Sequence, residues 1–205
     1  LKIINTYFSP DIIQKELLEI TESDGVPPEI SGLCSIIENT VQRANTELFK
    51  INNRENETTR SFMGTTLVGV YITGEGHIIF FHIGDSRIYR FRNGILSPVT
   101  RDHSQYEEWL GSGKIGKAPG KNVLTRAIGF FEFVETEVSW QKYMKNDVFL
   151  LCSDGLTGMI SDQRIEAILT SHSDISEAVT ILIKEANEAG GKDNVSAILC
   201  RINKT

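Results

Sequence analysis

The chain has 205 residues, which is long enough to bury one sizeable core and short for two domains. Its formal net charge of -6 gives no support for binding to nucleic acid or to an anionic membrane surface. Three widely spaced cysteines, Cys34, Cys152 and Cys200, indicate reduced thiols in the cytoplasm rather than a disulfide framework or a zinc site. No apolar run approaches the length that spans a membrane.

The first quarter of the chain has helical spacing. Ser9-Pro10 is typical of a helix start, and apolar residues form a stripe over residues 12–20. Apolar residues three and four apart over residues 30–48 predict a longer helix with one buried face. Residues 52–60 are polar, so we expect a surface loop there.

From residue 65 the apolar pattern changes to the alternation that strands show. Residues 65–73 and 77–83 predict two strands around a glycine turn. Residues 87–91, followed by a turn at Asn93-Gly94, are expected to continue the antiparallel meander.

The last third predicts strands, then helices, then a strand. Residues 133–140 and 147–152 are expected to pair as two strands. One helix is expected to start near Ser161-Asp162 and another at the cap Asp174, before a closing strand over residues 195–202. This order of elements predicts an α+β fold in which helices cover antiparallel sheets.

Three aspartates lie next to or within two residues of a glycine at the ends of apolar strands. Asp154 lies in Ser-Asp-Gly after residues 148–152, Asp193 lies in Gly-Gly-Lys-Asp-Asn before the closing strand, and Asp85 lies in Gly-Asp-Ser-Arg after residues 77–83. Gly155 allows a tight turn, so that the Asp154 carboxylate can approach a ligand. Each motif alone is an ordinary turn, but three strand-end carboxylates in one small domain favour a site for hard divalent cations.

Other motifs give weaker evidence of a functional site. The segment 111–118 fits a glycine-rich nucleotide loop only in part, because no strand precedes it and Ala118 occupies the position of the magnesium-binding hydroxyl. The four histidines show no zinc-ligand spacing, so a structural role is expected for each.

Six motifs in order resemble the metal-dependent protein phosphatases of type 2C, the PPM family, and above all its bacterial serine/threonine branch. They are Met63-Gly64-Thr65-Thr66, Gly84-Asp85-Ser86-Arg87, Thr100-Arg101-Asp102-His103-Ser104, Leu124-Thr125-Arg126-Ala127-Ile128-Gly129, Ser153-Asp154-Gly155-Leu156 and Gly191-Lys192-Asp193-Asn194. The resemblance implies a four-layer α-β-β-α sandwich of antiparallel sheets flanked by helices. It also implies a single catalytic domain over residues 1–205, with a flap-like segment at about 105–121.

The resemblance also implies chemistry and ligands. It implies hydrolysis of phosphoserine and phosphothreonine in proteins by a water that Mn²⁺ or Mg²⁺ activates, with two core ions and a weak third. Asp154 and Asp193 match ligands of a core ion, and Asp85 is implied, with Asp154, as a ligand of the third. Asn194 is expected to orient Asp193, and Gly155 to support Asp154. Thr65, Thr66 and Arg126 are expected to be structural.

The sequence differs from this family in its N-terminal motifs. The family's N-terminal strand with an acidic ligand and an arginine, and its Asp-Gly-x-Gly-Gly loop, have no match in these residues. We therefore expect an N-terminally incomplete domain, in which no catalytic residue beyond the metal ligands is identified and a chain starting at Leu1 is inactive. A pseudophosphatase that serves as a protein-binding module is the alternative.

The resemblance also implies partners. The expected partners are phosphorylated proteins, themselves substrates of a serine/threonine kinase, with no nucleic acid and no membrane. The protein is expected to be a cytoplasmic monomer.

Overall fold

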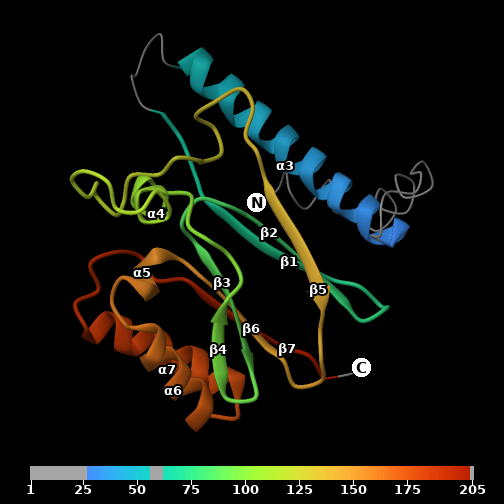
Figure 1. The fold of residues 1–205 in the computed structure, drawn as a ribbon, viewed down its shortest axis with the longest axis vertical. Coiled ribbons are helices and arrows are strands. Elements are labelled where there is room, and N and C mark those ends of the chain that lie inside the picture. The colour runs from blue at the N-terminus through green and yellow to red at the C-terminus, as the bar shows by residue number, and fades with distance from the viewer. Residues whose placement is uncertain (1–26, 56–61, 204–205) are drawn as a thin grey trace.

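The computed structural model describes residues 27–55 and 62–203 of the chain (Figure 1). The helix expected over residues 12–20 lies outside these residues. The helices are α3 (Pro28–Glu55), α4 (Gln105–Gly111), α5 (Asp154–Thr157), α6 (Asp162–Ser171) and α7 (Ile175–Glu188). The strands are β1 (Leu67–Ile72), β2 (His77–Ile83), β3 (Arg87–Arg92), β4 (Ile95–Pro98), β5 (Glu137–Lys142), β6 (Val148–Cys152) and β7 (Ala197–Arg201).

The strands form two antiparallel sheets that lie between helices. One sheet has the order β1-β2-β5 and the other has the order β4-β3-β6-β7. Figure 1 shows α3 across the outer face of the first sheet, and α6 and α7 against the outer face of the second. The expected α+β fold with four α-β-β-α layers is confirmed.

Alternation along the central strands builds three layers of core. On β2, Ile79, Phe81 and Ile83 pack against α3, whereas Ile78 and Phe80 face the second sheet. On β6, Leu150 and Cys152 pack against α6 and α7, whereas Phe149 and Leu151 face the first sheet. Both strands are therefore buried on both faces, which fixes their register because a slip of one residue would exchange the two apolar sets.

The predicted strand pairing was wrong in two places. β5 and β6 do not pair with each other, because β5 pairs with β2 and β6 lies between β3 and β7. β2 and β3 also belong to different sheets, so the expected meander is broken at residues 84–86. An alternating pattern identifies a strand but not its neighbour, and both connections carry the chain from one sheet to the other.

Local helix signals were more reliable. Ser161 caps α6 and accepts a hydrogen bond from the backbone of Arg164, and Asp174 caps α7 through the backbone of Ser176. Both helices begin where the sequence predicted. Among the described residues, no helix is long and apolar enough to cross a membrane.

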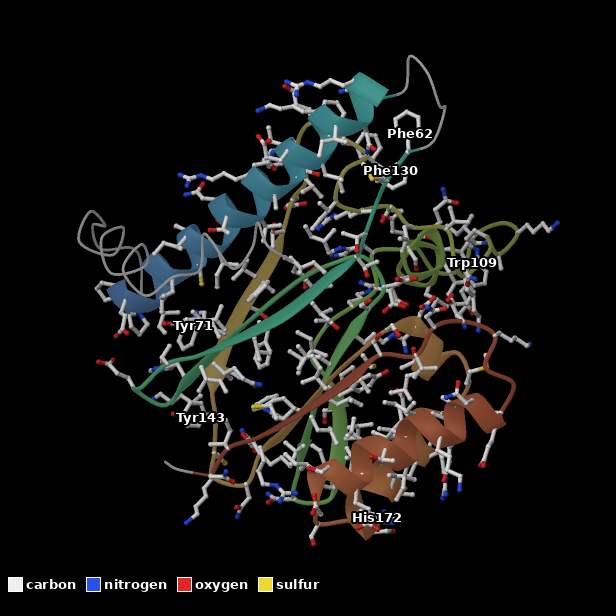
Figure 2. All side chains as sticks on the ribbon, turned by 180° about the vertical axis from the view of Figure 1, so that it is seen from behind. Phe62, Tyr71, Trp109, Phe130, Tyr143 and His172 are labelled. Carbon is white, nitrogen blue, oxygen red and sulfur yellow. The ribbon has the colours of Figure 1, made fainter. Side chains whose placement is uncertain are left out.

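The prediction of a polar loop from residue 52 was wrong at its start, because α3 continues to Glu55. Asn52 is helical and 1% exposed, and it ties the helix to two other segments. Its amide donates to the carbonyls of Met63 and Gly129, both at 2.8 Å, and its Oδ1 accepts from the Met63 amide at 2.8 Å. Near this end of α3, the rings of Phe62 and Phe130 stack with centroids 6.5 Å apart (Figure 2).

Replacing Asn52 by alanine is expected to destabilise the fold. Three backbone groups would lose their partner, one in a buried and two in a part-buried hydrogen bond, and each unsatisfied buried group costs about 1–3 kcal/mol. We expect the free energy of unfolding, measured by urea denaturation, to fall by about 3 kcal/mol. Asn53→Ala, at the exposed neighbouring position, is the control and should change it by less than about 0.5 kcal/mol. Equal stability of the two variants would contradict the structural role of Asn52.

Candidate metal centre

The three aspartates predicted as metal ligands line one cleft of about 470 Å³. They come from three separate places in the chain: the connection between β2 and β3, the end of β6, and the loop before β7. The residues that line the cleft are Asp85, Arg87, Asp102, Lys121, Asn122, Asp154, Gly155, Thr157, Gly158, Met159, Lys192 and Asp193. The fold thus brings the predicted residues to the wall of the same cavity.

Asp154 follows β6 and is the first residue of α5. Ser153, just before it, bonds to the loop that carries Asp193: its amide donates to the Ser196 carbonyl at 3.0 Å, and its hydroxyl donates to the Asn194 carbonyl at 3.0 Å. The same hydroxyl accepts from the Ser196 amide at 3.0 Å. Ser153 therefore fastens the two ligand loops together, a role that the sequence did not indicate.

Gly155 allows these loops to approach each other. A Cβ at this position would lie 2.4 Å from the carbonyl oxygen of Asn194 and 2.9 Å from its carbonyl carbon. Such contacts with backbone atoms leave no room for a side chain. Gly155 was expected to support Asp154, and the structure gives a specific reason for glycine: the backbone of the second loop occupies the space of a Cβ.

The contact between Asn194 and Asp193 runs through the backbone. The amide of Asn194 donates to Oδ1 of Asp193 at 2.7 Å. This bond orients one carboxylate oxygen of Asp193 and leaves its other oxygen available to a cation. Because the donor is the main chain, this bond does not depend on the Asn194 side chain, and the orienting role expected of that side chain stays a prediction.

Asp85 lies where the chain crosses from the first sheet to the second. Gly84 before it has a φ of 100°, and a Cβ there would lie 2.4 Å from Cγ2 of Thr66. Thr66 also shares a hydrogen bond of 2.9 Å with Ser86. Burial, and then the nearby Asp154 carboxylate, raise the pKa of Asp85 above its ordinary value. The second cause is repulsion between two carboxylates that line the same cleft.

Arg87 forms its ion pair with Asp102 rather than with Asp85. Its guanidinium forms a two-pronged ion pair with Asp102, with Nε to Oδ1 at 2.7 Å and Nη2 to Oδ2 at 2.8 Å. The neighbouring positions of Asp85 and Arg87 in the sequence suggest a local ion pair between them, but the described structure pairs the guanidinium with Asp102 instead. Asp102 also lines the cleft and was missed as a site residue, although it lies in a motif that the resemblance used.

The segment between Gln105 and Lys121 lies beside the cleft, where a flap was expected. It begins with α4, whose cap Ser104 accepts a hydrogen bond from the Glu107 amide at 3.2 Å. The Lys121 ammonium lies 5.2 Å from the centre of the Tyr106 ring, and Lys121 lines the cleft. Figure 2 shows Trp109 of α4 on this segment. Through Lys121, the segment therefore brings a positive charge to a cleft that is rich in carboxylates.

A second cluster joins His82, His103 and Glu137, whose ligand atoms lie within 4.8 Å of one another. The two imidazoles stack with centroids 4.3 Å apart and planes 22° apart. Imidazole lone pairs lie in the ring plane, so two nearly parallel rings cannot both point at one ion. The Gly84 amide also donates to Nδ1 of His103 at 3.1 Å, which leaves the proton on Nε2. The cluster fits a hydrogen-bonded network better than a metal site.

The donor set of the cleft fits hard divalent cations. Carboxylate oxygens are the ligands that Mg²⁺ and Mn²⁺ prefer in proteins. Burial is the main cause of the raised pKa of Asp85, and repulsion by the Asp154 carboxylate adds to it. A bound cation would relieve this repulsion.

Comparison with known proteins assigns the family. The family model described as protein phosphatase 2C matches residues 11–199 of the chain. The chain belongs to the protein phosphatase 2C family. Serine/threonine phosphatase Stp of Listeria innocua is 36% identical over 172 residues, which cover 82% of this chain and 67% of that protein. Protein phosphatase PhpP of Streptococcus pneumoniae is 36% identical over 147 residues, which cover 69% of this chain and 59% of that protein.

Solved structures of protein phosphatase 2C relatives share the fold. The serine/threonine phosphatase of S. agalactiae superposes with a TM-score of 0.77 at 29% identity, covering 94% of this chain and 80% of that one. The catalytic domain of PstP, solved in complex with two manganese ions, has a TM-score of 0.74 at 26% identity, covering 99% and 82%. The expected family is confirmed, and these phosphatase names give no support to the pseudophosphatase alternative. The chain spans about two thirds or less of the length of Stp and PhpP.

Removing the charge of Asp85 is expected to stabilise the metal-free protein. Because its folded pKa lies above the ordinary 3.8, ionised Asp85 costs stability at neutral pH, and the cost disappears as the pH falls through the raised pKa. In thermal melts at pH 7, Asp85→Asn should raise the Tm on the order of 2 °C, after allowance for partial solvent screening. The gain should vanish in acid. A lower Tm for Asp85→Asn at pH 7 would instead make Asp85 a structural residue.

Proposed function

We propose that the protein hydrolyses phosphoserine and phosphothreonine in proteins with a divalent metal ion. The observation that carries the proposal is the cleft in which Asp154, Asp193 and Asp85 meet. Membership of the protein phosphatase 2C family and the names of the similar proteins support it. Among the residues that the structure describes, the cleft is lined by one hydroxyl side chain, Thr157, and by no serine, cysteine or histidine, so a nucleophile is best supplied by water.

The residues of the cleft have distinct tasks. Asp154 and Asp193 would hold a core ion, and Asp85 with Asp154 would hold a weaker third one. Bound Mn²⁺ or Mg²⁺ acidifies water and neutralises phosphoryl charge, which is the chemistry that a slow phosphate ester requires. Ser153 and Gly155 keep the two ligand loops at a fixed separation. Lys121 and Lys192 line the same cleft and would attract the anionic substrate.

We further propose that residues 1–205 belong to a single catalytic domain that is N-terminally incomplete, with its flap at about 105–121. The Asp-Gly-x-Gly-Gly loop of the family is absent from these residues. The aspartate of that loop is therefore not among the ligands that we propose. Two core ions and a weak third are proposed by analogy with the family, and the PstP catalytic domain was solved with two manganese ions.

The proposed setting is a cytoplasmic monomer that reverses the action of a serine/threonine kinase. Cys34, Cys152 and Cys200 are all free thiols, as expected for a reducing compartment. Burial raises the pKa of Cys34 to about 11 and that of Cys152 to about 12, so neither is a reactive thiolate at neutral pH.

Turnover tests this function. The full-length protein, treated with EDTA and dialysed, is given p-nitrophenyl phosphate or a phosphothreonine peptide with and without Mn²⁺ or Mg²⁺. Hydrolysis is expected only with metal, and activity that survives EDTA would reject the proposal. The 205-residue chain alone should be inactive or nearly so, since no bridging aspartate is present, and robust turnover by it would show that the site lies elsewhere.

A further inference from the structure

The loop that carries Asp102 is tied on both sides of that residue to the end of β2. On one side, Nε2 of His82 donates to the carbonyl of Arg101 at 2.9 Å. On the other, the amide of His103 donates to the carbonyl of Gly84 at 2.9 Å. Gly84 directly precedes Asp85, so these bonds join the segments of two carboxylates that line the cleft.

The imidazole of His103 adds a third bond to the same place. The Gly84 amide donates to its Nδ1 at 3.1 Å, so Gly84 exchanges two hydrogen bonds with His103, one through the backbone and one through the ring. A nitrogen that accepts a hydrogen bond carries no proton, and the proton of a neutral ring then lies on Nε2. Nε2 lies 3.2 Å from Oε2 of Glu137, which accepts that proton's hydrogen bond.

The surroundings of His103 keep its imidazole neutral, with the proton on Nε2. His103 is 7% exposed and His82 is 2% exposed, and the two rings stack. Burial, and the neighbouring charges of His82 and Arg126, lower the pKa of His103, whereas the bond to Glu137 opposes them. The ring therefore has one neutral arrangement that satisfies both Gly84 and Glu137.

We propose that His103 is a positioning residue of the metal centre: its neutral Nε2-protonated imidazole locks Gly84 and so fixes Asp85 relative to Asp102 on the cleft wall. The inference rests on the proposed function, because it assigns a role toward the metal that this function requires. His103 does not line the cleft and would act only through the two carboxylate segments. Mutation of a residue that orients a metal ligand typically weakens metal affinity about 10–100-fold.

Two amide substitutions test the contacts of the two ring nitrogens of His103 separately. Asparagine places an oxygen near the position of Nδ1, so His103→Asn keeps an acceptor for the Gly84 amide. Glutamine reaches toward the position of Nε2, so His103→Gln keeps a contact with Glu137 and loses that acceptor. Glu137→Gln is the matched control, because its amide oxygen still accepts from Nε2.

Calorimetric titration of the full-length protein with Mn²⁺ is the first test, on variants that thermal melts show to be folded. We expect His103→Gln to weaken Mn²⁺ binding about 10–100-fold at the weaker site that Asp85 and Asp154 would form. His103→Asn and Glu137→Gln should stay close to the wild type. Equal affinity of the asparagine and glutamine variants would overturn the inference.

The second test reads the tautomer directly and needs no substitution, metal or substrate. Imidazole ¹⁵N shifts of the metal-free wild type should show His103 protonated on Nε2 and unprotonated on Nδ1 at pH 7.5. A proton on Nδ1, or rapid exchange between the two nitrogens, would overturn the inference. Absent phosphatase turnover together with this tautomer and the asparagine-glutamine difference would reject the proposed function and leave the positioning role standing.

Discussion

Asp154→Asn is expected to reduce metal-dependent phosphate hydrolysis by roughly 100-fold or more without unfolding the protein. Asp154 begins α5 just after β6 and lines the cleft that Asp85 and Asp193 also line, so it can serve both a core ion and the weaker one. A metal ion supplies several kcal/mol of transition-state stabilisation, and each 1.36 kcal/mol changes the rate about tenfold. Asparagine keeps the shape of the side chain and removes its charge.

The measurement is initial-rate kinetics on a phosphothreonine peptide over a range of Mn²⁺ concentrations, with thermal melts to confirm folding. Asp162→Asn is the control, since that carboxylate lies in the first turn of α6 and accepts from Tyr89 outside the cleft. An Asp154→Asn variant as active as this control would identify Asp154 as an ordinary turn residue, for which asparagine is a good substitute.

Gly155→Ala is expected to damage both stability and metal binding. The new methyl carbon would meet the Asn194 carbonyl oxygen at 2.4 Å, and backbone cannot move aside as the end of a side chain can. Relief of this contact must push the loop of Asp193 away from that of Asp154. We expect a loss of roughly 1–3 kcal/mol in the free energy of unfolding, typical of overpacking, together with weaker Mn²⁺ binding.

Gly74→Ala is the matched control for this substitution. A Cβ at Gly74 would meet no atom within 4 Å, so the variant should be close to the wild type in urea denaturation and in Mn²⁺ titration. If Gly155→Ala is as stable as Gly74→Ala and binds Mn²⁺ equally well, the two ligand loops are not as closely packed as the structure shows.

The sequence predicted the fold class and the cleft because both depend on local signals in a recognisable order. The caps Ser161 and Asp174 mark helix starts through contacts within three residues. Aspartate beside glycine at a strand end marks Asp154 and Asp85. Six motifs in the right order then identified the family, and with it the layers that bring those residues together.

Long-range partners could not be predicted from these signals. The ion pair of Arg87 with Asp102 spans 15 positions, and an alternating pattern does not tell whether β5 lies beside β6 or beside β2. Asn52 lies in a polar stretch, and its burial depends on backbone groups of two distant segments. Similarly, nothing in the spacing of His82 and His103 indicated that their rings stack.

The most direct test of the metal centre is calorimetric titration of Mn²⁺ into the full-length wild type, Asp154→Asn and Asp193→Asn, all shown to be folded. We expect saturable binding to the wild type and clearly weaker binding to both variants, because each substitution removes one ligand charge from the same cleft. Unchanged Mn²⁺ affinity in both variants would contradict this assignment of the ligands, and the aspartates would then be turn residues in a domain whose metal lies elsewhere.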